Sequence, residues 1–286
     1  MMITILIIFT FLIVTLFILL FLLLKTDFKP DLFYRSFHKI NDVENYYNKY
    51  TKKYLEVVPS AIQSHRTAEE PEMFEYFMAS MGISDGMRLL DAGCGVCGPA
   101  VYFASKYDIR IDAVTNSEVQ LQISKENIEK NDLCGKISVV KGDYHFLDRD
   151  YNHGAYDVVY FLESYGHACD HKKALKSASK LLKKGGVLYI KDYFKRDVKN
   201  MKVIKKVSSN MNKKYFYNLP DLYYTLHILR NLDFEIIKTG VPRFEHDMGE
   251  KAVEFERNNN IDLFGEYKVY GRIAYADLLE LVFRKT

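Results

Sequence analysis

The stretch LLDAGCGVCGPA holds residue types that could do chemistry in two different ways. Gly93, Gly95 and Gly98 form the pattern G-x-G-x-x-G, which is typical of a turn between a strand and a helix that holds a cofactor. Cys94 and Cys97 form the pattern C-x-x-C, which occurs in thiol redox sites. Taken alone, the glycines do not identify the cofactor.

The two cysteines lack the neighbours of a reactive thiol. No Lys, Arg or His adjoins Cys94 or Cys97 to lower a thiol pKa. Four cysteines in 286 residues also do not look like a disulfide framework, so reduced thiols in a cytosolic environment are expected. We interpret the C-x-x-C pattern as incidental to the turn.

A second group of reactive side chains lies in the sequence FLESYGHACD. Glu163, Tyr165 and His167 follow the apolar run YDVVYFL, at the end of a predicted strand, where α/β sheets bind ligands. The simpler interpretations are a helix cap for Glu163 and a structural histidine for His167. His167 and His171 are spaced like zinc ligands, with Cys and Asp nearby, but no second ligand pair follows, so no metal is expected.

These side chains are placed by alternating strands and helices. Crossover helices of ten or more residues between strands indicate a parallel sheet. We predict an α/β, doubly wound, mostly parallel Rossmann-like sheet with an antiparallel C-terminal edge, preceded by one transmembrane helix. Strands are expected at 87–91, 109–114, 137–141, 156–162, 187–192, 234–239 and 278–284, and helices at 69–81, 98–106, 117–131, 172–182 and 221–231.

Residues 3–24 are uncharged and almost wholly apolar. As a helix they would span roughly 33 Å, enough to cross a bilayer. No basic residue precedes them and no small-residue cleavage site follows, which favours a retained anchor over a cleaved signal. Lys25, Lys29, Arg35 and Lys39 follow the span, so the positive-inside rule predicts a single-pass membrane protein with its main body in the cytosol.

The domain organisation follows from this pattern. Residues 1–24 are predicted to be the anchor, 25–81 a linker and a helical cap rich in aromatics, and 82–286 the α/β domain. The net charge of +3 and the absence of a basic stripe with exposed aromatics argue against a nucleic-acid partner. The segment 195–214 is an exception, with eight basic residues and one acid, and is interpreted either as a lipid-facing surface or as a solvated helix.

The second strand argues against a nicotinamide dinucleotide. Such a site needs an acidic residue at the end of that strand, about 20 residues after the glycines, to bind the ribose. Thr115 stands there, and Asp112 comes too early. An NAD(P)-dependent oxidoreductase remains an alternative only.

The motifs together resemble class I S-adenosylmethionine-dependent methyltransferases over roughly residues 41–286. Leu90-Asp91-Ala92-Gly93-Cys94-Gly95 followed by Pro99-Ala100 looks most like the sterol, tocopherol and cyclopropane-type C-methyltransferase branch. The same branch resembles this chain in T-N-S…Q after the second strand, in E-x-x-x-H at Glu163 and His167, and in the upstream NYYNKYTKKY. Cys97 departs from the glycine of that family, and LEVVPSAIQSHR replaces its aromatic, glycine-rich stretch.

The resemblance implies S-adenosylmethionine as cofactor and a role for each matching residue. Asp91, Gly93 and Gly95, with Cys94 in the same turn, would meet the amino-acid end. Around the ribose would lie Thr115, Asn116 and Gln120, and around the adenine Asp143 and Tyr144.

Methyl transfer is an in-line displacement in which positioning dominates. An alkene acceptor would become a cation, which needs a carboxylate or aromatic faces and then a base. Glu163, His167 and Tyr165 are the candidates for these roles. The aromatic residues of the cap are interpreted either as a cover over the pocket or as ordinary core packing: Tyr46, Tyr47, Tyr50, Tyr54, Phe74 and Phe77.

The predicted function is a membrane-anchored methyltransferase acting on a small lipophilic molecule, isoprenoid or sterol-like, at carbon. The alternatives are N- or O-methylation of an amine or phenol metabolite, the oxidoreductase, and a catalytically silent cofactor-binding scaffold. The oligomeric state is not determined by the sequence.

Overall fold

The chain divides into two units, Met1–Arg35 and Ser36–Thr286. The computed structural model describes residues of the second unit only: 38–64, 67, 69–196, 201–248, 251–262, 264, 268–269, 272–273 and 276–286.

The predicted membrane span at residues 3–24 lies outside the described residues. Within the described ranges, no helix is both long enough and apolar enough to cross a membrane. The span therefore stays a prediction.

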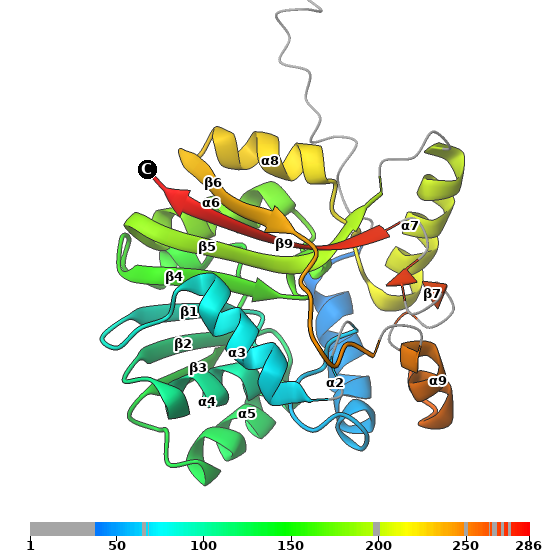
Figure 1. Cartoon of the computed structure of the whole chain (residues 1–286), viewed down its shortest axis with the longest axis horizontal. Coiled ribbons are helices and arrows are strands. Elements are labelled where there is room, and N and C mark those ends of the chain that lie inside the picture. Colours follow the sequence, from blue (N-terminus) through cyan, green and yellow to red (C-terminus); the bar gives the residue numbers. More distant parts are fainter. Residues whose placement is uncertain are drawn as a thin grey trace, which may run out of the picture. The chain divides into compact units, whose positions relative to one another are not determined.

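Seven strands of the described chain form one sheet in the order β3-β2-β1-β4-β5-β9-β6 (Figure 1). The first five are parallel: β1 Arg88–Ala92, β2 Arg110–Thr115, β3 Ile137–Lys141, β4 Tyr156–Leu162 and β5 Leu182–Lys195. Because the strand order reverses between β1 and β4, a crevice forms beyond their carboxyl ends. The predicted doubly wound α/β class is confirmed.

The end of the sheet differs in detail from the prediction. β9 (Ala276–Lys285) is antiparallel to both β5 and β6 (Phe234–Gly240), as expected for late strands in a mixed sheet. However, β9 lies between its two partners, so β6 is the edge strand. β5 is also longer than predicted, because its end pairs with the start of β9 as far as Lys195.

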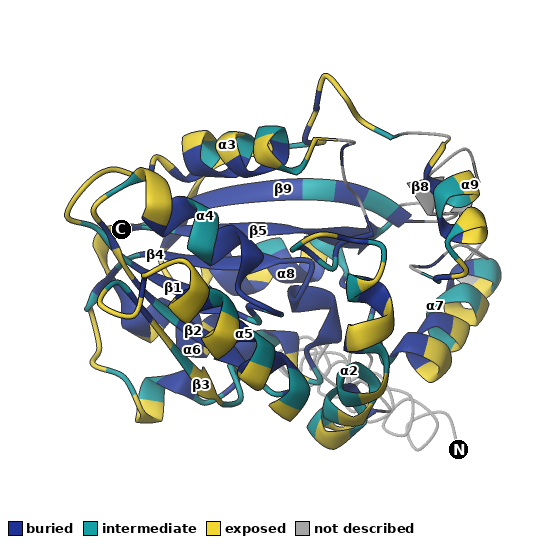
Figure 2. Ribbon diagram, turned by 90° about the horizontal axis from the view of Figure 1, so that it is seen from below, coloured by how far each residue is buried: buried dark blue, intermediate teal, exposed yellow. Residues whose placement is uncertain are grey.

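Helices cover both faces of the sheet (Figures 1 and 2). One face carries α3 (Glu70–Met81), α4 (Gly98–Lys106) and α5 (Glu118–Lys130), and the other α6 (His171–Leu181) and α8 (Leu222–Arg230). Three of them begin at a capping side chain that accepts a backbone N–H three residues later: Ser117, Asp170 and Asp221. Short 3₁₀ turns lie at η2 (Leu147–Arg149) and η3 (Tyr165–His167).

Further elements lie beside this core: α2 (Ile40–Leu55), α7 (Met201–Tyr215), α9 (Lys251–Asn258) and the small hairpin β7 (Lys268–Val269) and β8 (Arg272–Ile273). Tyr193 of β5, Met211 and Tyr215 of α7, and Phe264 pack in one apolar cluster. The helices α2 and α3, predicted as a cap, belong to the same compact unit as the sheet.

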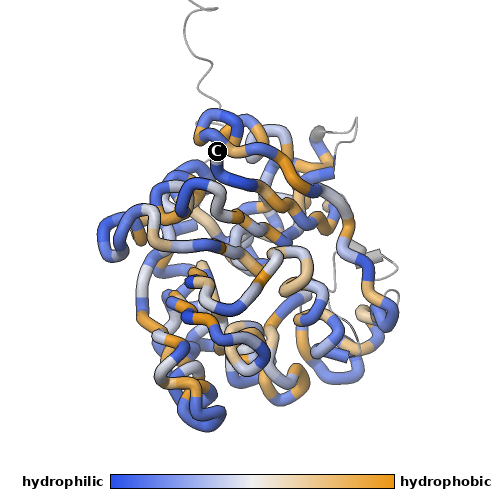
Figure 3. The backbone as a smooth tube through the Cα atoms, turned by 60° about the vertical axis from the view of Figure 1, so that its left-hand side comes forward, coloured by the Kyte–Doolittle hydropathy of each residue, from blue (hydrophilic) through white to orange (hydrophobic). Residues whose placement is uncertain are grey.

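The core follows the hydrophobic pattern of the strands. Figure 2 shows β5 and β9 buried along most of their length, whereas α3, α5 and α7 alternate buried and exposed residues. Figure 3 shows hydrophilic residues along many outer turns of the chain. The sheet is thus a rigid, buried support for the loops at its carboxyl edge.

Candidate active site

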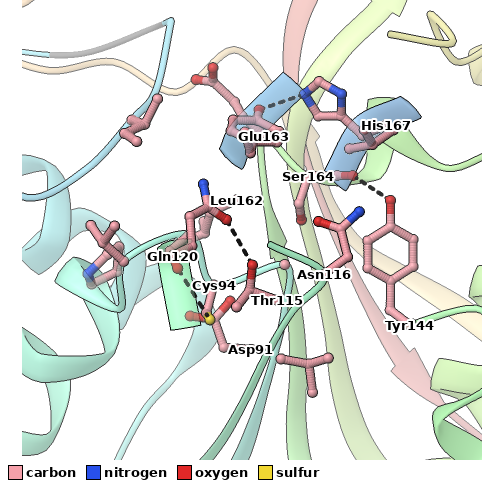
Figure 4. A pocket seen from close by; sticks show the side chains of 18 of the residues that line it. Asp91, Cys94, Thr115, Asn116, Gln120, Tyr144, Leu162, Glu163, Ser164 and His167 are labelled. Atoms are coloured by element: carbon pink, nitrogen blue, oxygen red, sulfur yellow. Dashed lines mark hydrogen bonds between the residues drawn. The ribbon is translucent and has the colours of Figure 1, made fainter. Parts of the chain in front are cut away.

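A cavity of about 780 Å³, counting the part open to solvent, lies at the carboxyl ends of β1, β2 and β4. Figure 4 shows many of its side chains projecting from different strands and loops toward one space. Every residue that the sequence assigns to the cofactor lines this cavity: Asp91, Gly93, Cys94, Gly95, Thr115, Asn116, Gln120, Asp143 and Tyr144.

Asp91 is a buried carboxyl group at the end of β1, with a 2% exposed surface. Burial raises its pKa to about 7, and no charged neighbour in the described part of the chain contributes to that shift. A buried carboxylate without a counter-ion is costly. Asp91 therefore fits a cationic ligand group, such as the ammonium group of an amino acid.

The glycine turn is shaped by close contacts. Gly93 has φ +98°, and a Cβ at this position would lie 2.5 Å from the Ser164 Cβ. Gly95 has φ +55°, and no atom lies within 4 Å of the place of its Cβ. Cys97, which stands where related enzymes have glycine, adopts φ 61° and is fully buried. The chain thus accepts a Cβ in the left-handed region at Cys97 but not at Gly93.

Polar side chains at the end of β2 are held in place by local hydrogen bonds. The Thr115 hydroxyl donates to the Gln120 Oε1 at 2.7 Å, as the dashed line in Figure 4 shows. Asn116 donates to the backbone oxygen of Ile40 at 3.3 Å, which joins this strand end to α2. Thr115 and Gln120 are both buried. The loop therefore presents fixed polar groups to the cavity.

Asp143 and Tyr144 follow β3. Burial raises the pKa of Asp143, but the hydrogen bonds and charge of His145 outweigh it and leave the pKa below its usual range. Asp143 is thus an ionised acceptor, suited to an exocyclic amino group. The Tyr144 hydroxyl donates to the Ser164 carbonyl oxygen at 2.9 Å.

A second cavity of about 380 Å³, again counting open space, adjoins the first. Both are lined by Tyr47, Ile62, Glu163 and His167. The second is otherwise mostly aromatic, with Tyr46, Tyr54, Tyr215, Tyr217 and Phe264, and it also includes Ser64 and Asp262. We call it the aromatic cavity. Two of the predicted catalytic residues therefore lie where the two spaces meet.

Glu163 is held at this junction by two contacts of its carboxylate. Its side chain forms an ion pair with Lys191 of β5, which is fully buried. Its other carboxylate oxygen accepts the Ser64 N–H at 2.6 Å. Lys191 also donates to Gln63 at 2.6 Å. Glu163 has φ 54°, a conformation that non-glycine residues keep only where surrounding contacts enforce it.

His167 is a neutral imidazole in this environment. Burial lowers its pKa to about 4. Its Nδ1 lies 3.1 Å from the Phe216 carbonyl oxygen, which can only accept, so Nδ1 carries the proton. Nε2 then accepts the hydroxyl proton of Tyr47 at 2.8 Å. Nε2 is therefore the atom of His167 that can accept a proton from a group in the cavities.

Tyr165 does not reach either cavity, which corrects its predicted place beside the substrate. It is fully buried, and its hydroxyl lies 3.2 Å from the Thr225 hydroxyl of α8. Its ring packs against Phe161 and Phe194. The tight η3 turn directs it to the α8 side of the sheet.

The carboxylates around the aromatic cavity have partners. Lys214 pairs with Asp262 at 2.8 Å, and the Tyr215 hydroxyl donates to Asp262 at 2.6 Å. Behind the cavity, burial raises the pKa of Asp192 to about 7, and this side chain accepts hydrogen bonds from Tyr217 and from the Gly166 N–H. No lysine or arginine side chain lines the aromatic cavity among the described residues.

The sequence-based prediction missed part of this site. Lys191 carried a signal, because a lysine inside the apolar run VLYIKDYF is expected to have a buried partner. Tyr215, Tyr217 and Phe264 gave no local signal, since they lie in the part of the chain after β5, where strands and helices no longer alternate regularly. Tyr46, Tyr47 and Tyr54 do line the cavities, whereas Phe74 and Phe77 belong to the apolar core.

The C-x-x-C pattern and the histidine spacing are the remaining motifs of the sequence analysis. Cys94 and Cys97 are free and buried, and burial raises the pKa of Cys94 well above its usual value. No group of three or more His, Cys, Asp or Glu side chains in the described ranges is arranged to hold a metal ion.

The mycolic acid cyclopropane synthetase family matches residues 63–248 of this chain. The sterol 24-C-methyltransferases of Aspergillus fumigatus and Candida albicans are 34% and 32% identical to it over 124 residues, which are 43% of this chain and 32% of theirs. The matched part thus spans about a third of the length of these curated relatives.

Two solved structures share the fold. The geranyl diphosphate C-methyltransferase of Streptomyces coelicolor has a TM-score of 0.71 at 15% identity, over 86% of this chain and 97% of that one. The [4+2]-cyclase SpnF has a TM-score of 0.70 at 20% identity, over 85% and 94%. At such low identities the likeness concerns the fold alone.

Proposed function

Because this chain belongs to the mycolic acid cyclopropane synthetase family, we propose that it is a membrane-anchored methyltransferase. It transfers the methyl group of S-adenosylmethionine to a carbon atom of a lipophilic, isoprenoid or sterol-like acceptor. The observation that carries the proposal is a pair of adjoining cavities that meet at Glu163 and His167. One is the aromatic cavity. The other contains the polar side chains assigned to the cofactor, among them Asp91, Thr115 and Asp143, and we call it the polar cavity.

The polar cavity fits the cofactor. When bound, S-adenosylmethionine supplies an electrophilic methyl carbon on a sulfonium. Asp91 would hold its ammonium group, since this buried carboxyl has no charged neighbour among the described residues. Thr115 and Gln120 would bind the ribose, and Asp143 the adenine amino group. At Gly95 no atom lies within 4 Å of the place of a Cβ, so the turn leaves room there for close approach of the ligand to the backbone.

The aromatic cavity fits an uncharged, apolar acceptor. Tyrosine rings provide apolar faces, and burial raises the pKa of Tyr46 and Tyr47 so that both stay protonated. No lysine or arginine side chain in the described part lines this cavity, which supports an uncharged acceptor.

The junction supplies charge stabilisation and a proton acceptor. Bond formation at an alkene carbon leaves a cation on the acceptor, and the ionised Glu163 and the tyrosine faces stabilise positive charge there. A proton must then leave the adjacent carbon. The Tyr47 hydroxyl and the His167 Nε2, 2.8 Å apart, form a route that accepts it.

The membrane part of the proposal rests on residues 3–24 of the sequence. An anchor of this kind would keep the two cavities close to an acceptor dissolved in the bilayer. The basic residues that follow the apolar run support a cytosolic position for the catalytic unit, by the positive-inside rule.

The test is transfer of labelled methyl groups. Membranes containing the full chain are incubated with methyl-labelled S-adenosylmethionine and a lipid extract, and binding of the cofactor is measured by calorimetry. We expect label in an uncharged lipid. Absence of cofactor binding would overturn the proposal, binding without transfer would indicate a silent scaffold, and label in a water-soluble amine or phenol would indicate the alternative acceptor class.

A further inference from the structure

Helix α7 carries an unbalanced charge. Its sequence, MKVIKKVSSNMNKKY, contains five lysines and no acidic residue. In the chain as a whole, 40 basic residues are nearly balanced by 37 acidic ones. The helix therefore concentrates positive charge in a molecule that is otherwise close to neutral.

The lysines lie on the side of α7 that faces away from the protein. Ile204, Met211 and Tyr215 are buried on one side of the helix. Lys202, Lys206 and Lys213 are exposed and fall on the opposite side by the helical period, and the exposed Lys205 flanks them. The fifth, Lys214, pairs with Asp262. The four form no ion pair with described residues, and we call them the lysine face.

The chain enters the described structure beside this helix. Asn212 of α7 donates a hydrogen bond to the His38 Nδ1 at 2.9 Å, and His38 is the first described residue. The apolar run ends at Leu24. The roughly 14 residues between these points can span at most about 50 Å when extended.

Helix α7 also borders the aromatic cavity. Its last residue, Tyr215, lines that cavity, and Tyr217 follows two residues later. A surface bound to the lysine face would thus lie next to the acceptor site. Since the acceptor is proposed to be a lipid, the occupant that suits both features is a membrane surface.

We propose that the lysine face of α7 docks on the anionic surface of the lipid bilayer that holds residues 3–24. This inference rests on the proposed function, because it takes the membrane anchor as given. Each lysine close to an anionic surface strengthens its attraction about fivefold, and the tether adds a high effective concentration.

The test measures how fast lysines are acetylated by an amine reagent, read by mass spectrometry. The full chain is reconstituted in nanodiscs of phosphatidylcholine alone, or with about a third of the lipid as anionic phosphatidylserine. Lys213 is the reporter on α7. Lys125 of α5, which is exposed and lies on a different helix, is the reference.

We expect Lys213 to react at least about fivefold more slowly in anionic than in neutral discs, while Lys125 reacts equally in both. Salt of about 1 M, which shortens the screening length to about 3 Å, should remove the protection. The variant K202Q/K205Q/K206Q should also remove it. The matched variant K130Q/K176Q/K184Q, which changes exposed lysines elsewhere and keeps the reference Lys125, should keep it.

The proposal is overturned if Lys213 reacts at the same rate in the two kinds of disc, whether or not it is slower than Lys125 in both. Protection of detergent-solubilised protein by soluble RNA or polyglutamate, without protection in anionic discs, would assign the lysine face to another polyanion. A chain that does not stay with the discs overturns the anchor and the docking together. Calorimetry with S-adenosylmethionine on the same sample measures cofactor binding separately, and so tests the proposed function independently of the docking.

Discussion

Asp91 shows how a single buried residue links folding to ligand binding. Its pKa is raised to about 7 by burial, against an ordinary value of 3.8. The folded state therefore binds a proton more tightly than the unfolded state, so the group makes the unliganded protein less stable as pH rises from about 4 to 7. A cationic ligand group would relieve that cost.

We predict that the affinity for S-adenosylmethionine depends on pH through Asp91. Only the ionised carboxylate attracts the ammonium group, so affinity should fall about tenfold per unit below pH 6 and level off above pH 8. Calorimetry in buffers of different ionisation enthalpy should also detect proton release on binding near pH 6.

Asp91→Asn separates this role from a structural one. The variant should lose cofactor binding, yet the unliganded protein should be more stable than the parent at pH 8, because the buried charge is gone. Retained, pH-dependent binding in Asp91→Asn would contradict the assignment. Denaturant unfolding at pH 5 and pH 8 gives the stability comparison.

The buried Glu163–Lys191 pair gives a second prediction. Lys191→Met leaves the carboxylate without its counter-ion and should cost roughly 3–5 kcal/mol of stability. Glu163→Gln should spare cofactor binding and slow methyl transfer, and Lys191→Met/Glu163→Gln should recover part of the stability without recovering activity. Full activity of Glu163→Gln in the labelled-methyl assay would remove Glu163 from the mechanism.

At the scale of elements, the glycine turn and the loop after β4 constrain each other. The Gly93 backbone lies so close to Ser164 that a Cβ would be 2.5 Å from the serine Cβ. The Ser164 hydroxyl donates to the Ala92 carbonyl oxygen at 2.6 Å, which holds the two loops together. The turn that would face the cofactor is thus fixed by the loop that carries Glu163.

Gly93→Ala should therefore destabilise the protein by about 3 kcal/mol, from left-handed strain and from the clash. Gly185→Ala is the matched control, since Gly185 has φ +80° but no atom within 4 Å of the place of its Cβ. It should cost only about 1 kcal/mol. If Ser164→Gly fails to reduce the loss in Gly93→Ala, measured by denaturant unfolding, the clash is not the cause.

At the scale of the whole molecule, the unit Ser36–Thr286 contains all described residues of both cavities, while the predicted anchor lies in Met1–Arg35. Deletion of residues 1–35 should therefore leave cofactor affinity within about twofold of the parent, because the described lining of the first cavity lies in the second unit. Methyl transfer to a bilayer-dissolved lipid should fall at least tenfold, as the effective concentration at the membrane is lost. Unchanged transfer from vesicles would show that the anchor has no part in catalysis.

Local patterns were enough to predict most strands and helices. The β3 and β4 bounds and helix α4 agree with the prediction residue for residue, because apolar runs bounded by glycines and caps report on local structure. The places of Asp91, Thr115 and Asp143 followed as well, since the carboxyl ends of parallel strands share one edge. Tyr165 was misplaced, because the direction of a side chain in a 3₁₀ turn depends on the packing around it.

The amino-acid sequence by itself determined the α/β class, the order of the sheet strands along the chain and the nine residues assigned to the cofactor, all of which line the polar cavity. These depend on periodicity and on short motifs, which are local properties. Only the tertiary structure decided that Lys191 pairs with Glu163, that Tyr47 bonds to His167, and that Tyr215 and Phe264 enclose an aromatic cavity. Those contacts join segments far apart in the chain, and their geometry arises from the packing of α2 and α7 at one edge of the sheet.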